Sequence, residues 1–289
     1  MTVDTLLATA WDDHGDRPHD VADRLAGSLW MVDSPEQIPP FAHLLTHVLG
    51  EHLGQWQRGI GLLEALRDLP AFDGGAVDGV ITRAVATLRY ASGDAAALMS
   101  LSLQDRVAAL AGAAAALAGR SEFKSALAAY SEAVQLASTG LPPGSSAVRS
   151  LAVGGNNLAL ALEQKEDRDS SEALGMITAA TASLKYWKQA GTWVEEERAE
   201  YRLTRSLLRA GKSEDAIQSA RRCIDVCESN NATVFEQFFG YAVLALSQRA
   251  AGDFGAFEAS RRLALALFER IPDDKRKWCE SELKELGAI

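Results

Sequence analysis

The stretch that decides the fold of this 289-residue chain reads GRSEFKSALAAYSEA over residues 119–133. A short polar turn is followed by Phe123, Ala126, Tyr130 and Ala133, which are spaced by three, four and three residues. This spacing places all four side chains on one stripe of an α-helix. Small residues at the second and fourth positions let a neighbouring helix approach, and the larger residue between them fills the groove. The stretch therefore predicts the second helix of a packed helical hairpin.

The same offsets recur four more times along the chain. The further copies are Trp56, Gly59, Leu63 and Leu66; Ser170, Ala173, Ile177 and Ala180; Ser213, Ala216, Ala220 and Cys223; and Phe254, Phe257, Arg261 and Ala264. A single hairpin of this kind cannot bury its own apolar face, so successive hairpins are expected to stack around one core. Residues 95–102 are too short for a full second helix, which predicts an irregularity near residue 100.

Composition places the chain in the all-α class. Hydrophobic residues make up 47% of it, but aromatic residues only 7%, and the apolar content comes mainly from the helix formers Ala and Leu. A net charge of −10 argues against nucleic acid as the main partner, because phosphate binding needs a basic surface. No stretch approaches the roughly 18 apolar residues of a membrane span, and no signal segment is recognised. An odd count of three cysteines fits a reducing compartment, so we predict a cytoplasmic protein without a membrane or cofactor.

These repeats resemble the tetratricopeptide-repeat (TPR) family, which pairs small residues at helix contacts with a Gly-Asp-aromatic turn. The matching turns are Gly252-Asp253-Phe254 and Gly54-Gln55-Trp56, and Asn156-Asn157-Leu158-Ala159 with Glu172-Ala173-Leu174 is similar to the kinesin-light-chain type of repeat. The repeat period agrees with that longer type, since Ala216 follows Ala173 by 43 residues and precedes Phe257 by 41, against roughly 34 in the simple repeat. The resemblance covers about residues 38–270. It implies an all-α, right-handed α-α superhelix of about seven helical hairpins.

The expected organisation is a single TPR-like solenoid over residues 1–289. Irregular repeats occupy residues 1–100, more regular repeats occupy 103–270, and a capping helix occupies 273–287. The capping helix mixes charged residues with a narrow apolar seam of Trp278, Leu283 and Leu286. First helices of the hairpins line the concave groove in the resembled family, so binding residues are expected on them.

Four arginines form the clearest candidate for a binding site. Arg198, Arg202, Arg205 and Arg209 lie on one stripe of one predicted first helix, with Tyr201 beside them. Guanidinium groups in such a row hold acidic side chains, a phosphorylated segment or a carboxylate terminus through paired hydrogen bonds. The alternative is a solvated face, neutralised by acidic residues 195–197 and 200 on the same helix and by acids of the next helix.

Two further residues are candidates for the groove. In the resembled repeats, a groove-facing asparagine hydrogen-bonds the backbone of a bound peptide, and Asn156 occupies that position here. Asn157 is expected to point more toward the neighbouring repeat. Phe239 belongs to an aromatic cluster that is predicted to lie mainly in the core, and it is the member that could face the groove.

A histidine set near residue 47 is the candidate for metal binding. His43, His47 and Glu51 follow one another by one helical turn, with His52 adjacent. Two histidines one turn apart can share a metal ion, and a carboxylate one turn later can be a third ligand. The sequence lacks a His-Glu-x-x-His motif, so it offers no positioned general base. Structural histidines in a helical bundle are the alternative, and the prediction is that no metal is bound.

The sequence therefore predicts a non-enzymatic scaffold or adaptor that binds a protein or peptide in the groove of a TPR-like superhelix. The partner is expected to be acidic or to present a carboxylate terminus, and the oligomeric state is left open. One alternative is a regulatory or sensor module that binds a small anionic ligand inside the superhelix. Another is a metal-dependent enzyme that uses the N-terminal histidine cluster. The fold alone does not separate them, because function is grafted onto a scaffold.

Overall fold

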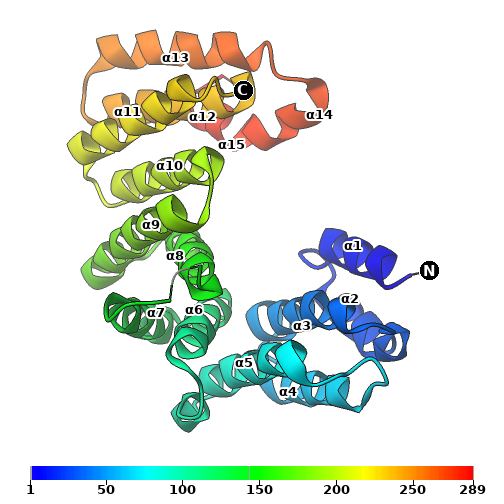
Figure 1. The fold of residues 1–289 in the computed structure, drawn as a ribbon. Coiled ribbons are helices and arrows are strands. Elements are labelled where there is room, and N and C mark those ends of the chain that lie inside the picture. Colours follow the sequence, from blue (N-terminus) through cyan, green and yellow to red (C-terminus); the bar gives the residue numbers. More distant parts are fainter. Residues whose placement is uncertain (1, 143, 289) are drawn as a thin grey trace. The chain divides into compact units, whose positions relative to one another are not determined.

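A computed structural model describes residues 2–142 and 144–288, and this part of the chain consists of helices and their connections without a strand (Figure 1). The chain divides into two compact units, Met1–Gly154 and Gly155–Ile289, with the boundary inside helix α8. Each unit is described by itself below. The expectation of one continuous solenoid stays a prediction, whereas the all-α helical-repeat architecture is confirmed.

Unit 1 begins with short helices and continues with longer hairpins. Its elements are α1 (Val3–Asp13), α2 (Pro18–Ala26), α3 (Ile38–Thr46), the π-helix η3 (His47–His52), α4 (Trp56–Ala65), α5 (Gly75–Ala91), α6 (Leu103–Gly119), α7 (Phe123–Ser138) and the first part of α8 (Ser146–Gln164). Short 3₁₀ helices lie at Leu29–Met31, Pro35–Gln37, Leu66–Asp68 and Ala95–Leu98. The helix at Ala95–Leu98 stands where a full second helix would otherwise follow α5, so the predicted irregularity near residue 100 is confirmed.

Unit 2 contains the regular hairpins. After the end of α8 it continues with α9 (Ser170–Ala190), α10 (Trp193–Arg209), α11 (Ser213–Ser229), α12 (Val234–Ala250) and α13 (Phe254–Phe268). Three short pieces follow, α14 (Asp273–Arg276), a 3₁₀ turn (Lys277–Cys279) and α15 (Glu280–Glu285), where one capping helix was expected. Helices adjacent in sequence pack against each other from α9 to α13, and α10 also contacts α12. First helices of successive hairpins are thus neighbours.

The second helices begin where the repeated offsets predict. Helices α4, α7, α9, α11 and α13 start at Trp56, Phe123, Ser170, Ser213 and Phe254, the first position of each copy. Glycines that precede two of these starts adopt the left-handed region, with φ of +62° at Gly54 and +81° at Gly252. Such a residue ends a helix tightly, so the next helix can turn back at once.

Small residues of the repeat occupy close helix contacts. Ala126, Ala133, Ala216 and Ala220 are fully buried. Gly59 on α4 shows why size matters, because a Cβ added there would lie 2.6 Å from Leu88 Cδ1. The small positions of the pattern are therefore sites of close approach between helices, as predicted.

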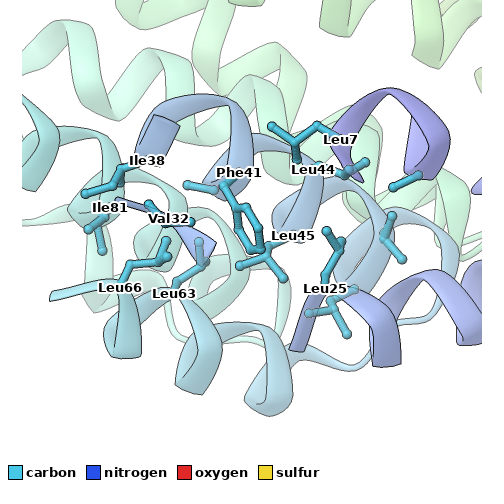
Figure 2. Close-up of a cluster of buried hydrophobic side chains, with 14 of the residues drawn as sticks. Leu7, Leu25, Val32, Ile38, Phe41, Leu44, Leu45, Leu63, Leu66 and Ile81 are labelled. Carbon is cyan, nitrogen blue, oxygen red and sulfur yellow. The ribbon is translucent and has the colours of Figure 1, made fainter. Parts of the chain in front are cut away.

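The core of unit 1 is aliphatic. Figure 2 shows Phe41 and Leu45 of α3 among side chains from α2 and α4, with Leu25 and Leu63 pointing toward them. All four are fully buried. Burial of each such side chain contributes roughly 1.5–3 kcal/mol to folding, so this cluster holds the short N-terminal helices in place.

The core of unit 2 includes the segment after α13. Cys279, Leu283 and Leu286 are buried against α12 and α13, together with Phe238 and Phe257. The segment therefore closes the apolar end of the last hairpin, as a cap does. The expectation that Trp278 belongs to its apolar seam is wrong, since that side chain is 65% exposed and Cys279 is buried instead.

Cys223, Cys227 and Cys279 are free thiols and are buried in the core. Among the described residues, no helix combines the length and apolarity needed to cross a membrane.

Candidate functional site

Helix α10 presents the arginine stripe. Its start is fixed by a capping box, in which the Thr192 side chain accepts from the backbone and Glu195 reaches back to the Thr192 backbone N–H. From this start the helix continues without a break to Arg209, so residues at offsets of four, three and four stay on one side. The structure brings all four predicted arginines into ion pairs with acids of unit 2.

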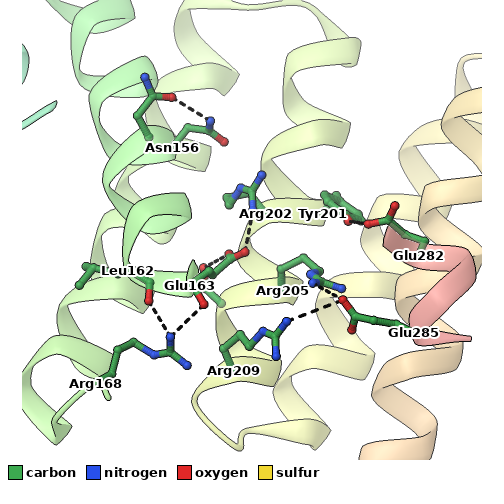
Figure 3. Close-up of polar contacts among 12 residues, drawn as sticks. Asn156, Leu162, Glu163, Arg168, Tyr201, Arg202, Arg205, Arg209, Glu282 and Glu285 are labelled. Carbon is green, nitrogen blue, oxygen red and sulfur yellow. Dashed lines mark hydrogen bonds and ion pairs between the residues drawn. The ribbon is translucent and has the colours of Figure 1, made fainter. Parts of the chain in front are cut away.

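Arg202 binds Glu163 of the neighbouring first helix, α8. Its Nη1 lies 2.6 Å from Glu163 Oε2, and the Ser206 hydroxyl donates to Glu163 Oε1 at 2.9 Å (Figure 3). Burial raises the pKa of the Glu163 carboxyl above its usual value, and the charge of Arg202 opposes this shift. Arg168 donates to the backbone carbonyls of Leu162 at 2.7 Å and Glu163 at 2.9 Å, which ties down the end of α8. Glu163 is therefore held in one position beneath the stripe.

The middle of the stripe is covered by α15. Arg205 Nη2 lies 2.7 Å from Glu285 Oε1, and Arg209 Nη2 lies 3.7 Å from the same oxygen (Figure 3). One turn earlier on α15, Glu282 accepts a hydrogen bond from the Tyr201 hydroxyl. Burial, followed by the charge of Glu282, raises the pKa of Tyr201 well above its usual range. A phenol and two guanidiniums of α10 thus bind two carboxylates spaced by three residues on one helix.

Arg198 begins the stripe near α12. Its Nη2 lies 2.6 Å from Glu236 Oε1, yet the arginine side chain is 60% exposed. Arg209 at the opposite end is 47% exposed, whereas Arg205 between them is only 10% exposed. Nη1 of Arg205 is buried without a hydrogen-bond partner. The two ends of the stripe, Arg198 and Arg209, therefore face solvent, and α15 shields its centre at Arg205.

Asn156 and Phe239, the two other residues predicted to face the groove, contact neighbouring side chains of unit 2. The Asn156 side-chain amide donates to Asn157 Oδ1 at 3.3 Å, and both residues are half-buried on α8. The ring of Phe239 packs edge-on against Tyr201, with ring centroids 5.6 Å apart, and against Phe235 and Phe238. Phe239 therefore links the aromatic part of the core to the ring of Tyr201 beside the stripe.

Two of the acids at 195–197 and 200, Glu197 and Glu200, also have partners away from the stripe, although the charges of Glu195 and Glu197 act on Arg198. Glu197 and Glu200 are both buried toward α11, where the Ser219 hydroxyl donates to Glu200 Oε2 at 2.9 Å and the Cys223 thiol donates to Glu197 Oε1 at 3.2 Å. Burial, above all, and the charge of nearby Glu236 raise the pKa of Glu197 to about 8. Glu197 and Glu200 thus bind the Cys223 thiol and the Ser219 hydroxyl of α11.

The histidine set is arranged differently from the predicted ligand trio. His47 Nδ1 lies 2.9 Å from Glu51 Oε2, so the carboxylate binds one nitrogen of the ring directly. The ring of His43 lies against Trp11, with centroids 5.5 Å apart. Partial burial lowers the pKa of His52. The structure brings His14 and His52, and not His43, to the free side of His47.

Sequence reasoning missed the acids that bind the stripe and the histidine that joins the cluster. Glu163, Glu282 and Glu285 are 39 to 81 residues from their partners, and His14 precedes His47 by a whole hairpin. No local spacing connects such residues. The one available signal was the position of residues 273–287 after the last hairpin. A segment that caps the last hairpin is expected to place its acidic residues against a first helix.

The chain has an all-α helical-repeat fold of the TPR-like kind. It matches the solved structure of a putative kinesin light chain from Podosopora anserina, described as having nearly identical TPR-like repeats, with a TM-score of 0.52 and 13% identity over 81% of this chain and 96% of that one. A single-substitution form of the same protein matches with the same TM-score and identity over 79% and 93%. At this identity the likeness establishes the fold alone. No protein-family model matches the sequence, and no curated protein matches it either.

Proposed function

We propose that this chain is a binding scaffold, without catalytic activity of its own, that holds an acidic segment of another protein on the face of unit 2 formed by the end of α8, α10 and α12. The arginines of α10 and Asn156 of α8 are the contact residues of this proposal. The TPR-like fold supports it in general terms, since stacked hairpins of this type display an extended surface for partners.

The observation that carries the proposal is the way α10 binds α15. Tyr201, Arg205 and Arg209 bind Glu282 and Glu285, two carboxylates on consecutive turns of one short helix. The stripe thereby holds within the chain the kind of ligand that we propose it takes from a partner. Guanidinium groups suit this role because they bind carboxylates through several donors in a fixed plane.

Donors remain for a second acidic group. Arg198 and Arg209 are 60% and 47% exposed, and Arg209 makes only a long contact of 3.7 Å with Glu285. A partner segment can engage these two ends while α15 stays in place. Alternatively it can replace Glu285 at Arg205, whose Nη1 has no hydrogen-bond partner. Both routes need negative charge on the partner.

The test compares two charge reversals in affinity capture from a lysate of the source cells. Arg198→Glu with Arg209→Glu alters the exposed ends of the stripe. Arg221→Glu with Arg262→Glu makes the same change in net charge on α11 and α13, where both residues are exposed. Arg205 is left intact because reversing a buried charge would destabilise the fold. Circular dichroism confirms that both variants remain helical.

We expect a protein that is retained by the wild type and by the Arg221/Arg262 variant, and lost from the Arg198/Arg209 variant. The captured protein should contain an acidic segment. A synthetic peptide of that segment should bind this chain more weakly as the salt concentration is raised, because exposed charges are screened. Equal retention by all three proteins would contradict a role of the stripe. Capture of no protein at all, with a rise in melting temperature on adding a small anion, would favour the sensor alternative instead.

A further inference from the structure

Three histidine rings converge in unit 1 beside Trp11. His14 follows α1, while His47 and His52 are the two ends of the π-helix η3. One ring nitrogen from each of the three lies within 4.8 Å of the others, and His47 Nε2 is 3.1 Å from His52 Nε2. The ring of His14 has its centroid 4.9 Å from that of His47 and 5.0 Å from that of His52. These residues lie in different parts of the sequence, so the fold itself gathers them.

The π-helix is what places His47 and His52 on the same side. In an α-helix with about 3.6 residues per turn, residues five apart point roughly 140° away from each other. A π-helix has hydrogen bonds from residue i+5 back to i, and here the Leu53 N–H donates to Val48 O at 3.1 Å. The wider turn brings the fifth residue back above the first. Single π turns of this sort are frequent at functional sites.

The end of α6 holds this unusual turn in place. A Cβ on Gly119 would lie 2.5 Å from the backbone oxygen of Glu51, so only glycine lets α6 approach so closely. The next residue, Arg120, donates from Nη1 to the backbone oxygen of His52 at 2.7 Å. Both contacts lock the backbone that carries the histidines. A rigid backbone reduces the ordering cost of binding an ion.

The ring nitrogens are oriented as in a metal site. An ionised Glu51 can only accept, so a neutral His47 ring beside it donates from Nδ1 and has its lone pair on Nε2, the nitrogen that faces His52. His14 Nδ1 hydrogen-bonds the backbone oxygen of Trp11, which leaves Nε2 of that ring as the free nitrogen. Metal-binding histidines commonly donate their second N–H to a carboxylate or a backbone carbonyl in this way. The contact of His47 Nε2 with His52 Nε2 then needs one proton between them, and a metal ion can take its place.

We propose that His14, His47 and His52 form a three-histidine site for a divalent metal ion of the zinc class. Zinc binds imidazole nitrogen at about 2.0–2.1 Å, which separates two nitrogens of a tetrahedral site by roughly 3.3 Å. The 3.1 Å between the two Nε2 atoms is close to this spacing. The ligand nitrogen of His14 lies within 4.8 Å of the other two, so this ring has to move closer to complete the site. Neutral imidazole ligands favour zinc, copper and nickel over magnesium and calcium.

Glu51 and Trp11 surround the three histidines and hold their rings in place. Glu51 holds the His47 ring from the side away from the ion, and Trp11 covers the set with ring centroids 5.1 Å from His14 and 5.2 Å from His47. All three ligands are half-buried, so an ion can enter from solvent and a water molecule can complete the coordination. The bound ion would join the end of α1 to the π-helix η3. Its first effect would be to stabilise the N-terminal helices.

The experiment titrates Zn²⁺ into the full chain, freed of affinity tags and treated with chelator, by isothermal titration calorimetry. We expect about one equivalent to bind, and His14→Ala and His52→Ala each to abolish this binding. His19→Ala is the matched control, because it removes a histidine of α2 outside the cluster and should bind as the wild type does. Glu51→Gln should weaken binding by about 10–100-fold, since it loosens the His47 ring without removing a ligand.

Two further readouts separate a site from adventitious binding. Co²⁺ in place of Zn²⁺ should give the intense visible absorption of four-coordinate cobalt in the wild type and in His19→Ala, and not in His14→Ala. Zn²⁺ should slow amide hydrogen exchange over residues 3–13 and raise the melting temperature, because it binds the folded state alone. The proposal is overturned if the wild type takes up no stoichiometric Zn²⁺, or if the His14 and His52 variants bind it as tightly as the wild type.

Discussion

Glu285 of α15 lies 2.7 Å from the guanidinium of Arg205 on α10, across 80 residues of sequence. The arginine is buried, while the glutamate is about one-third exposed. Their pairing does two things at once, because it neutralises a charge inside unit 2 and fixes the cap segment against a first helix. The same contact occupies the centre of the surface that we propose for partner binding.

Removing the Glu285 charge should destabilise unit 2. Glu285→Gln leaves the Arg205 guanidinium buried without its counter-charge, at an expected cost of about 1–3 kcal/mol in the free energy of unfolding. Glu280→Gln on the same helix is the control, since Glu280 is exposed and its replacement should change stability by less than about 0.5 kcal/mol. Urea unfolding followed by circular dichroism measures both. Equal midpoints for the two variants would show that the ion pair contributes nothing.

Freeing the arginines should strengthen partner binding. Glu282→Gln with Glu285→Gln removes the two carboxylates that compete for Tyr201, Arg205 and Arg209, and keeps the apolar contacts of Leu283 and Leu286. We expect this variant to retain more of an acidic partner than the wild type does in the capture experiment. Glu280→Gln again serves as the control. Weaker retention by the double variant would mean that α15 supports the binding surface and does not compete for it.

Two glycines on α4 should respond oppositely to alanine. Gly59→Ala places a Cβ 2.6 Å from Leu88 Cδ1 and 3.3 Å from Leu49 Cβ, and such overpacking costs about 1–3 kcal/mol. Gly61 is exposed with open space around it, so Gly61→Ala should stabilise α4 by up to about 1 kcal/mol through its higher helix propensity. Thermal unfolding measures both effects. A stabilising Gly59→Ala would contradict the role of small residues in this helical packing.

Stability should fall with rising pH through Glu197. The folded protein holds the pKa of this carboxyl at about 8, against a usual value of 4.5, chiefly because it is buried. Between these two values the folded state binds more protons than the unfolded state, so the free energy of unfolding decreases as pH rises through this window. Below about pH 4.5 both states are protonated and the difference vanishes.

Glu197→Gln isolates this contribution. The amide keeps an oxygen to accept from the Cys223 thiol, and it carries no titrating proton. Urea unfolding of wild type and variant at pH 5 and pH 8.5 should show a smaller loss of stability in the variant over that interval. The same loss in both proteins would assign the pH dependence to other groups.

The sequence by itself determined the helices and their repeat. Offsets of three, four and three residues, with glycine at the turns, located the starts of α4, α7, α9, α11 and α13 to the residue. This worked because helix periodicity, turn conformation and the need for small residues at close contacts are all written in neighbouring positions. The resemblance of these repeats to the TPR family indicated the TPR-like fold, and the short stretch 95–102 predicted the irregularity near residue 100.

Only the tertiary structure decided what the polar side chains bind. The stripe of α10 was visible in sequence as four arginines on one side, but its partners, such as Glu163 and Glu285, come from other helices. The trio of His14, His47 and His52 needed both the docking of α1 and a π turn, and helical spacing of 3.6 residues per turn pointed to His43 instead. The physical reason is that the spacing of residues along the chain fixes only which side of a helix each residue occupies. Which side chains of other helices contact that side depends on how the helices pack, and the local sequence does not record this.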